Sequence, residues 1–395
     1  MAFVAALSVL SALPVFALPV SHYAQSSVLS SGKWAKIRVE KTGMQFLSNA
    51  QLKNLGFANP SKVNVYGYGG RMISEVLDSK QIDDLPLLPC VRTEKGIVFF
   101  GVNSVDWTAS SSSKMKYRHI NHAYEDASYY FLSDREVDVK DMEEYGRVEL
   151  TGSPVTTFVE RIAYEKDLSC PTYTGRLMAG EDFRTVTARS FPFRLPDNVG
   201  GDARIKIGYV ARTTGGNAVF KASVNGKKLG SDCSVPVATN NTYLISKAVY
   251  YTLDDAGDKF DIDINFSLSS GAVLFHSNLD FIEIEYDRSL RLKDGSLHFY
   301  LRSPAGSVIE VSGCSASTVI WDVTDAAAPV RVGFTLDGTT ARFGTKDGSY
   351  REYVAFEPSK VAEAPVSAGK VSNQDIQSLP VPDMLIITPN EYQSQ

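Results

Sequence analysis

Residues 260–266 read FDIDINF, an unbroken alternation of apolar and polar side chains. A β-strand points successive side chains to opposite faces, so this pattern predicts a strand with one buried and one polar face. The same alternation occurs in residues 282–286, which read IEIEY, and in residues 35–40, which read AKIRVE. Half-buried strands of this kind belong to antiparallel sheets, so we predict a mainly β chain.

Turn signals separate several of these strands. The pairs Asn225-Gly226, Asp294-Gly295 and Asp337-Gly338 each stand between alternating apolar runs. Asn-Gly and Asp-Gly pairs favour the left-handed backbone of tight hairpins. Helical signals are few, and Ser48 and Gly56 bracket one predicted short helix as its N-cap and the residue just past its end. We therefore predict tandem β-sandwich or jelly-roll-like domains with minor helix.

Length and composition indicate a folded protein of two or three domains. The chain has 395 residues, of which 44% are hydrophobic and 22% charged. These proportions are typical of soluble globular proteins. The net charge of −5 gives no basic field that would attract nucleic acid, so we expect no nucleic-acid partner.

The first residues, 1–24, are predicted to be a secretory signal peptide. Residues 1–20 carry no charge, and Val15-Phe16-Ala17 resembles a cleavage site with small residues. The alternatives are an N-terminal membrane anchor or a buried strand. Pro14 and Pro19 disfavour a continuous membrane-spanning helix, so we expect an exported protein.

The rest of the chain is divided by changes in composition and strand spacing. Alternation is cleanest, with turns at the spacing of a sandwich, in the second part, and the linker is rich in Ala, Pro, Ser and Gly. The predicted parts are an N-terminal β-rich domain (25–184), a jelly-roll-like β-sandwich (185–290), a hairpin-rich domain or continuation (291–360), a linker (361–381) and the start of a further domain (382–395).

The segment that starts at Pro382 differs from the other strands. Residues 384–387 read MLII, a continuous apolar run. A strand buried on both faces has this pattern and is typical of parallel sheets flanked by helices. A parallel sheet needs crossover helices and further strands, which do not follow in the given sequence, so the run predicts the orphan first strand of a truncated α/β domain. From the pattern alone, a C-terminal edge strand of the preceding β-domain is an equal alternative.

Cysteine and histidine residues offer no recognisable catalytic signature. Cys90, Cys170, Cys233 and Cys314 lie far apart, so they predict either two disulfides in any of three pairings or four free thiols. His119 and His122 flank Asn121 in a stretch that we expect to be a solvated loop. The glycine loop of residues 66–70, YGYGG, follows a strand, but no helix with a phosphate site follows it.

Acidic and aromatic clusters are also weak signals of function. Asp254, Asp255 and Asp258 resemble part of a calcium loop but lack its spacing and its closing Glu. Asp261 and Asp263 share one face of a strand, as solvent-facing residues do. The aromatic cluster comprises Tyr117, Tyr124, Tyr129, Tyr130 and Phe131, and a β-core is its more common role than sugar stacking. We therefore assign no catalytic, cofactor-binding or metal-ligating residue, and expect no cofactor.

An ordered set of short segments resembles a known family. The segments are Ser31–Trp34, Lys36–Val39, Gln51–Phe57, Val65–Gly70, Asp83–Pro86, Ile97–Gly101, Trp107, Tyr129–Leu132, Gly180–Phe183, Val224–Gly226, Asp287–Leu290, Val319–Asp325 and Pro382–Thr388. Over nearly all of residues 28–389 they resemble the N-terminal portion of the PorU-type sortases of the type IX secretion system, a gingipain-related cysteine peptidase family of Bacteroidetes. The last segment resembles the opening strand of the gingipain-type protease domain, which favours the truncated α/β domain over an edge strand.

The resemblance implies a role at the cell surface. Members of this family remove the C-terminal signal from secreted cargo, attach the cargo to an anionic lipopolysaccharide, and associate with an outer-membrane β-barrel partner. Their catalytic Cys and His lie in the protease domain, and no residue of this chain matches them. The resemblance therefore implies a non-catalytic β-rich region of an outer-membrane-associated sortase. The alternative is a stand-alone secreted adhesin or glycan-binding β-sandwich protein.

Overall fold

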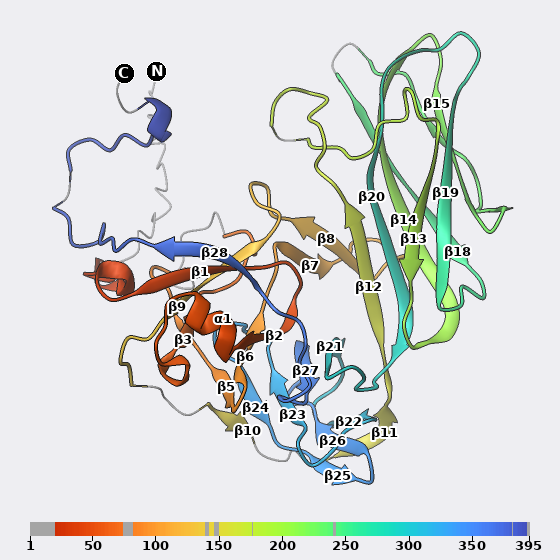
Figure 1. The fold of residues 1–395 in the computed structure, drawn as a ribbon. Helices are drawn as coiled ribbons and strands as arrows, with labels where there is room; N and C mark the ends of the chain where they lie inside the picture. The colour runs from red at the N-terminus through yellow and green to blue at the C-terminus, as the bar shows by residue number, and fades with distance from the viewer. Residues whose placement is uncertain are drawn as a thin grey trace, which may run out of the picture.

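The computed structural model describes residues 20–73, 82–138, 142–145, 150–175, 177–239, 242–380 and 382–392 (Figure 1). Strands dominate these residues, and they contain one short α-helix, α1 (Asn49–Asn54), so the prediction of a mainly β fold with minor helix is confirmed. Of the predicted signal peptide, residues 1–19 lie outside the described residues. No helix in the described part is long and apolar enough to cross a membrane.

The N- and C-terminal parts of the chain together form a stack of sheets, named here A, B, D and E. Their strands, in spatial order, are β28 (Val366–Val371), β1 (Trp34–Val39), β9 (Ser128–Ser133), β3 (Asn64–Tyr66) and β4 (Leu87–Leu88) in sheet A; β2 (Gly43–Ser48), β6 (Gly96–Gly101) and β5 (Cys90–Thr93) in sheet B; β10 (Glu144–Tyr145), β24 (Val330–Val332), β23 (Val319–Asp322), β27 (Tyr350–Phe356) and β21 (Ser296–Arg302) in sheet D; and β11 (Thr151–Val155), β22 (Ser307–Val311), β26 (Thr340–Gly344) and β25 (Thr335–Asp337) in sheet E.

Three hydrophobic cores lie between these four sheets, one at each interface. Ile37 of sheet A and Phe99 of sheet B share the first core. Val98 of sheet B packs with Trp321 of sheet D in the second, and Phe299 of sheet D packs with sheet E in the third. Strand β6 lies between two cores, which explains why the continuous apolar run of residues 97–100 is buried on both faces.

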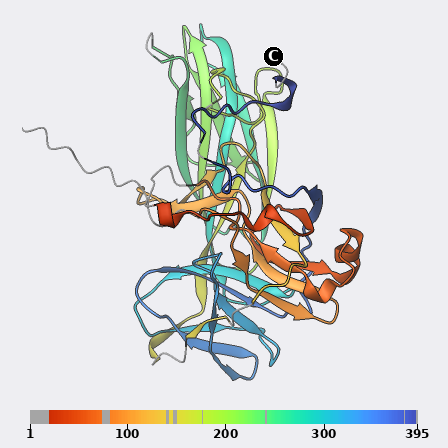
Figure 2. The ribbon, with the colours of Figure 1, turned by 90° about the vertical axis from the view of Figure 1, so that its left-hand side faces the viewer.

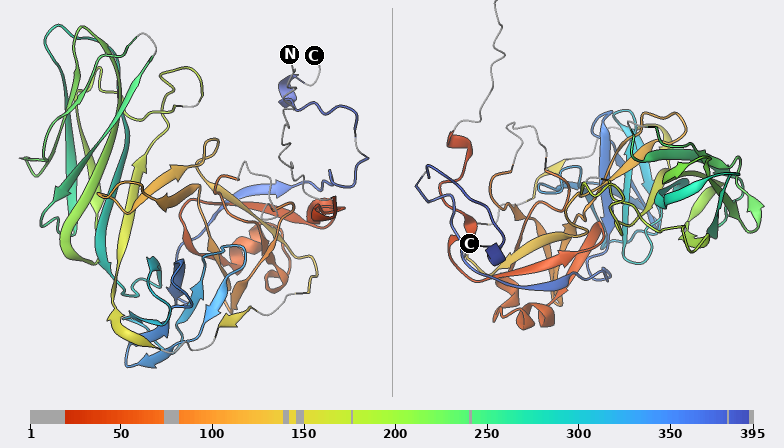
Figure 3. Two further views of the ribbon diagram at one scale, coloured as in Figure 1. Left: turned by 180° about the vertical axis from the view of Figure 1, so that it is seen from behind. Right: turned by 90° about the horizontal axis from the view of Figure 1, so that it is seen from above.

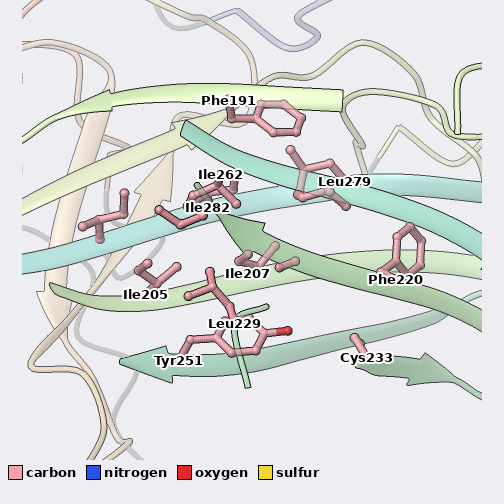
Figure 4. Close-up of a cluster of buried hydrophobic side chains, with 14 of the residues drawn as sticks. Phe191, Ile205, Ile207, Phe220, Leu229, Cys233, Tyr251, Ile262, Leu279 and Ile282 are labelled. Atoms are coloured by element: carbon pink, nitrogen blue, oxygen red, sulfur yellow. The ribbon is translucent and has the colours of Figure 1, made fainter. Parts of the chain in front are cut away.

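The middle of the chain forms a β-sandwich that stands beside this stack (Figures 1 and 2). Its sheets are named F and G, and large apolar side chains such as Ile207, Phe220, Ile262 and Ile282 fill the space between them (Figure 4). Sheet F contains β12 (Thr157–Glu165), β20 (Val273–Ser289), β14 (Asn198–Thr214) and β18 (Ile245–Leu253); sheet G contains β13 (Ala188–Arg194), β19 (Lys259–Leu268), β15 (Ala218–Val224) and β16 (Lys227–Lys228), and β17 (Cys233–Val235) also pairs with β15.

The predicted helix and the predicted Asn225-Gly226 turn both form. The side-chain oxygen of Ser48 accepts a hydrogen bond from the backbone N–H of Gln51, whose side chain accepts one from the Ser48 N–H in return, so α1 begins with a capping box. Asn225 and Gly226 both have positive φ and close the β15–β16 hairpin. The remaining helical turns are 3-10: η1 (Val20–His22), η2 (Val28–Ser30), η3 (Pro60–Lys62) and η4 (Asn390–Tyr392).

Strand pairing between distant segments differs from what these local signals suggest. Asp294 and Gly295 have positive φ, but β21 after them pairs with β27 rather than with residues 290–292. Sheet F begins at β12, before the boundary predicted at residues 184 and 185, and β11 pairs with β22 of the C-terminal part. The domain boundaries stay predictions, because alternation reports which residues form strands and not which strands pair.

The C-terminal segments also differ from expectation. The predicted linker, residues 361–381, contains β28, which pairs with β1 along the edge of sheet A (Figure 3). The strand predicted near Pro382 does not form. Residues 382–392 contain only η4, and the side chains of residues 384–387 are 74–89% exposed. A strand needs a neighbour for its backbone groups, and this apolar run has none in the described structure.

Candidate functional site

The candidate site lies where three parts of the chain meet. Hairpin C, formed by β7 (Val105–Ala109) and β8 (Tyr117–Asn121), covers the outer face of sheet F next to sheet D (Figure 1). Glu285 of β20 accepts hydrogen bonds from the backbone N–H groups of Lys116 at 3.0 Å and Tyr117 at 2.7 Å. Glu283 accepts one from the N–H of His119 at 2.9 Å. Both carboxylates are fully buried. They accept from backbone N–H groups of the hairpin that a neighbouring strand would otherwise bind.

The His119 side chain fastens this contact. Its Nδ1 lies 2.7 Å from Glu283 Oε1, and its Nε2 contacts the carboxylate of Glu165. Burial alone would lower the pKa of His119, but the hydrogen bonds with Glu165 and Glu283 outweigh it and raise the pKa to about 9. Lys206 Nζ lies 2.9 Å from the other oxygen of Glu283. The buried charges are therefore paired, which such a dry location requires.

A second buried ion pair joins sheet F to sheet D. Arg161 Nη2 of β12 lies 3.3 Å from Glu352 Oε1 of β27, and the Tyr350 hydroxyl donates to the same oxygen at 2.9 Å. The Arg161 guanidinium lies over the Tyr300 ring, with 3.5 Å between its central carbon and the ring centroid. Burial opposes ionisation of Glu352, but His298, Arg71 and Arg161 hold its pKa far below the usual range.

A cavity of about 240 Å³ opens beside this ion pair. Arg71 and Trp107 line it from the N-terminal part, Arg161 from sheet F, and His298 and Glu352 from sheet D. A larger cleft of about 690 Å³ lies beyond hairpin C, where His122 and the exposed Tyr124 face Glu165. Charged side chains and aromatic rings therefore converge where the three parts of the chain join.

The histidine stretch combines two different roles. His119 is a buried link between hairpin C and sheet F rather than a loop residue, whereas His122 follows β8 and accompanies Tyr124 at the cleft. Tyr130 lies in the core between sheets A and B, and Tyr117 lies in the junction at 4.8 Å from Arg161. Most of the aromatic cluster is thus structural, and Tyr124 is its exposed member.

All four cysteines are free thiols in this structure. Cys233 and Cys314 are buried in different cores. Cys170 is partly exposed, and hydrogen bonds from the Thr172 hydroxyl and from backbone N–H groups, including that of Gly175, lower its pKa to about 7. A cysteine peptidase needs a thiol beside an imidazole, and among the hydrogen bonds of the described residues no cysteine sulfur contacts a histidine.

The glycine loop serves packing. A Cβ on Gly70 would lie 2.4 Å from Ser128 Cβ, and one on Gly67 would lie 2.9 Å from the Tyr130 ring. Gly67 also has a φ of 141°, which an L side chain rarely adopts. These glycines let the chain pass closely over β9. Close packing against β9 therefore explains their spacing, and phosphate binding is not needed to explain it.

The acidic clusters remain on the surface. Asp254, Asp255 and Asp258 are exposed in the turn between β18 and β19, and Asp261 is exposed on sheet G. Among the described residues, no group of His, Cys, Asp and Glu side chains is placed to hold a metal ion.

Sequence reasoning missed the residues that make the junction. The alternation of residues 282–286 correctly assigned Glu283 and Glu285 to the polar face of a strand, but hairpin C covers that face. Arg161, His298 and Glu352 carry no local signal, because their meeting depends on strands far apart in the chain.

Comparison with known proteins relates the fold of this chain to a solved structure. No family model matches the chain, and no curated protein matches it. The crystal structure of dimeric latent PorU from Porphyromonas gingivalis matches with a TM-score of 0.78 and 26% sequence identity, covering 91% of this chain and 35% of that chain. This chain therefore has a PorU-like fold and spans about a third of the length of that protein.

Matches to carbohydrate-binding proteins are much weaker. A family 35 carbohydrate-binding module from Clostridium thermocellum matches with a TM-score of 0.21 and 15% identity, covering 34% of this chain and 98% of the module. A TM-score of this size supports no functional conclusion.

Proposed function

We propose that this chain is the non-catalytic β-rich region of a type IX secretion sortase of the PorU type. In this role it holds a cysteine protease domain in position against secreted cargo and against an outer-membrane β-barrel partner. The observation that supports the proposal most is the match to PorU over nine-tenths of the chain. The order of the sequence segments that resemble the family supports it independently.

The junction of sheets fits a scaffold role. His119 with Glu283 and Arg161 with Glu352 bind hairpin C, sheet F and sheet D to one another through buried, paired charges. Buried charges that have lost a partner cost several kcal/mol, on the order of 3. Such a joint opposes bending between the sandwich and the stack, which suits a protein that must position a second domain.

The apolar run near Pro382 has a place in the same proposal. Its exposed side chains, Met384 to Ile387, would be covered as the opening strand of the protease domain. Export and association with the cell surface follow from the same role.

The test uses the bacterium that encodes this chain. We expect deletion of the gene to leave secreted cargo with its C-terminal signal attached, and the native gene to restore its removal. Mass spectrometry of cargo C-termini from the outer membrane and the medium measures this directly. Fully processed, surface-attached cargo in the deletion strain would contradict the proposal.

A second candidate is a glycan-binding protein. The feature that favours it is an exposed aromatic pair on the sandwich, Tyr243 and Phe275, whose rings both lie close to the Arg212 guanidinium. Aromatic faces of this kind stack on sugars. A glycan array probed with the purified chain tests this role, and signals no higher than those of a Tyr243→Ala variant would exclude it.

A further inference from the structure

In the cavity beside Arg161, the acceptor groups are already engaged in hydrogen bonds, whereas several donor groups are not. Both carboxylates that line it are fully engaged. Glu160 Oε1 accepts from the Tyr300 hydroxyl at 2.7 Å and Glu160 Oε2 from Arg288 at 2.7 Å. Glu352 Oε1 accepts from Arg161 and Tyr350, and Glu352 Oε2 lies 3.4 Å from Arg71 Nη2. The neutral acceptor Asn103 Oδ1 accepts from the Thr42 hydroxyl at 2.8 Å.

The buried atoms that lack a hydrogen-bond partner in this cavity are nitrogens. Arg161 Nη1, Arg71 Nε and His298 Nε2 are each buried without a hydrogen bond, and all three side chains line the cavity. Arg71 Nε lies 3.2 Å from Asp106 Oδ1, and His298 Nε2 lies 3.4 Å from Glu352 Oε2, and neither contact meets the geometry of a hydrogen bond. A buried donor that is left unpaired is costly, most of all on a charged group.

The Arg161 guanidinium is held ready for an in-plane partner. Its side chain is 5% exposed, and the Tyr300 ring covers its face at 3.5 Å. Stacking occupies the face of a guanidinium and leaves its edge, which carries the N–H groups, for hydrogen bonds. One edge nitrogen, Nη2, binds Glu352, and the other, Nη1, has no partner.

We propose that this cavity binds the oxyanion group of a small ligand, a carboxylate, sulfate or phosphate. An oxyanion presents acceptor oxygens only, which complements unpaired donors next to acceptors that are already engaged. A neutral sugar fits less well, because each hydroxyl also needs an acceptor. The cavity volume of about 240 Å³ accommodates a small organic acid or an inorganic ion. This site is independent of the sortase proposal.

Local charge limits the strength of binding. Three arginines, Arg71, Arg161 and Arg288, face three carboxylates, Asp106, Glu160 and Glu352, so the charges in and around the cavity balance. Affinity must then come from hydrogen bonds to the unpaired donors rather than from a positive field, and we expect weak but saturable binding. Removal of one charged donor should weaken it about tenfold.

Tryptophan fluorescence provides the readout. Trp107 lines the cavity, whereas Trp34 and Trp321 are buried in cores elsewhere. The full chain is titrated with sodium acetate, sodium sulfate and sodium phosphate, and sodium chloride keeps the ionic strength constant. We expect a saturable change with at least one of the three probes, and its loss in a Trp107→Phe variant.

The variants separate the cavity from general salt effects. Arg71→Gln should weaken binding about tenfold. Arg184→Gln is the matched control, because Arg184 is an exposed arginine paired with Asp182 outside the cavity, and it should bind like the native chain. Circular dichroism checks that each variant is folded. If Arg71→Gln does not fold, His298→Gln serves as the second cavity variant.

Saturation by acetate alone would support a carboxylate ligand, and saturation by sulfate and phosphate alone would support a tetrahedral anion. A linear response to all three probes, or equal affinities in the native chain and both cavity variants, would overturn the proposal.

Discussion

Arg161 Nη2 lies 3.3 Å from Glu352 Oε1, although 191 residues separate the two in the chain. Arg161 belongs to the sandwich and Glu352 to the sheet stack, so this buried pair holds two parts of the molecule together. The His119–Glu283 contact does the same for hairpin C.

Loss of the Glu352 charge should destabilise the protein strongly. In Glu352→Gln, the buried guanidinium of Arg161 loses its counter-ion, and we expect the free energy of unfolding to fall by about 3 kcal/mol. Urea denaturation measures this change. The control is Glu363→Gln, whose exposed partner Lys41 is 3.5 Å away, and it should change stability by less than about 0.5 kcal/mol. Equal stabilities of the two variants would contradict a structural role for the pair.

The His119 contact predicts a loss of stability at alkaline pH. Its folded-state pKa of about 9 lies above the value near 6.5 expected in the unfolded chain, so the folded state holds the proton more tightly. Its contribution is complete below about pH 6.5 and is lost as the pH rises through about 9, an effect of up to about 3 kcal/mol.

The measurement compares unfolding free energies between about pH 6 and 10 for the native chain and His119→Gln. The imidazole contacts Glu165 and Glu283, Lys206 pairs with Glu283, and Asp280 lies nearby. These four charged groups stay unchanged in the comparison. We expect the gap between the two proteins to narrow with rising pH. A constant gap would show that His119 is not protonated in the folded protein.

Gly96 should tolerate no side chain. A Cβ at this position would lie 2.0 Å from the Leu47 carbonyl oxygen in the paired strand β2, and backbone atoms there cannot move aside cheaply. Gly96→Ala should therefore cost about 2 kcal/mol or more in unfolding free energy. Gly348→Ala is the matched control, because nothing lies within 4 Å of its added Cβ, and it should be nearly neutral.

Residues that follow β28 should be dispensable for stability, whereas β28 itself should be needed. Deletion of residues 380–395 removes exposed apolar side chains and none of the strands that the structure describes, so the melting temperature should stay the same and solubility should improve. Deletion from residue 365 onward also removes β28 and its pairing with β1, and should lower the melting temperature by about 3 °C or more. Equal effects of the two deletions would contradict this assignment.

Cys170 should be the reactive thiol of the chain. Its lowered pKa of about 7 and its partial exposure favour the thiolate at the surface, whereas burial raises the pKa of Cys233 and Cys314. At neutral pH, iodoacetamide should modify Cys170 about tenfold faster than either buried thiol. Peptide mass spectrometry over time measures the rates, and uniform labelling would contradict the structure around Cys170.

How far the sequence predicts this fold depends on the range of the interaction. Alternation in residues 260–266 and the capping signal at Ser48 act locally, and both predictions are confirmed. Residues 384–387 and residues 97–100 are both continuous apolar runs, yet the first forms no strand here, and the second forms a buried strand that pairs antiparallel with both of its neighbours. A run of apolar residues therefore specifies neither burial on both faces nor parallel pairing by itself.

The candidate site could not be predicted for the same reason. Glu283 and Glu285 have the sequence pattern of solvent-facing residues, and only the docking of hairpin C, more than 160 residues away, makes them buried ligands for its backbone. The Arg161–Glu352 pair likewise requires knowledge of which sheets lie side by side.

The coding DNA beyond the codon for Gln395 decides whether these β-sheets are the scaffold of a type IX sortase. We expect this DNA to encode further α/β strands with a catalytic His and Cys. A reading frame that closes there, with no protease sequence beyond it in any frame, would contradict the claim and would make the β-sheets themselves the functional unit.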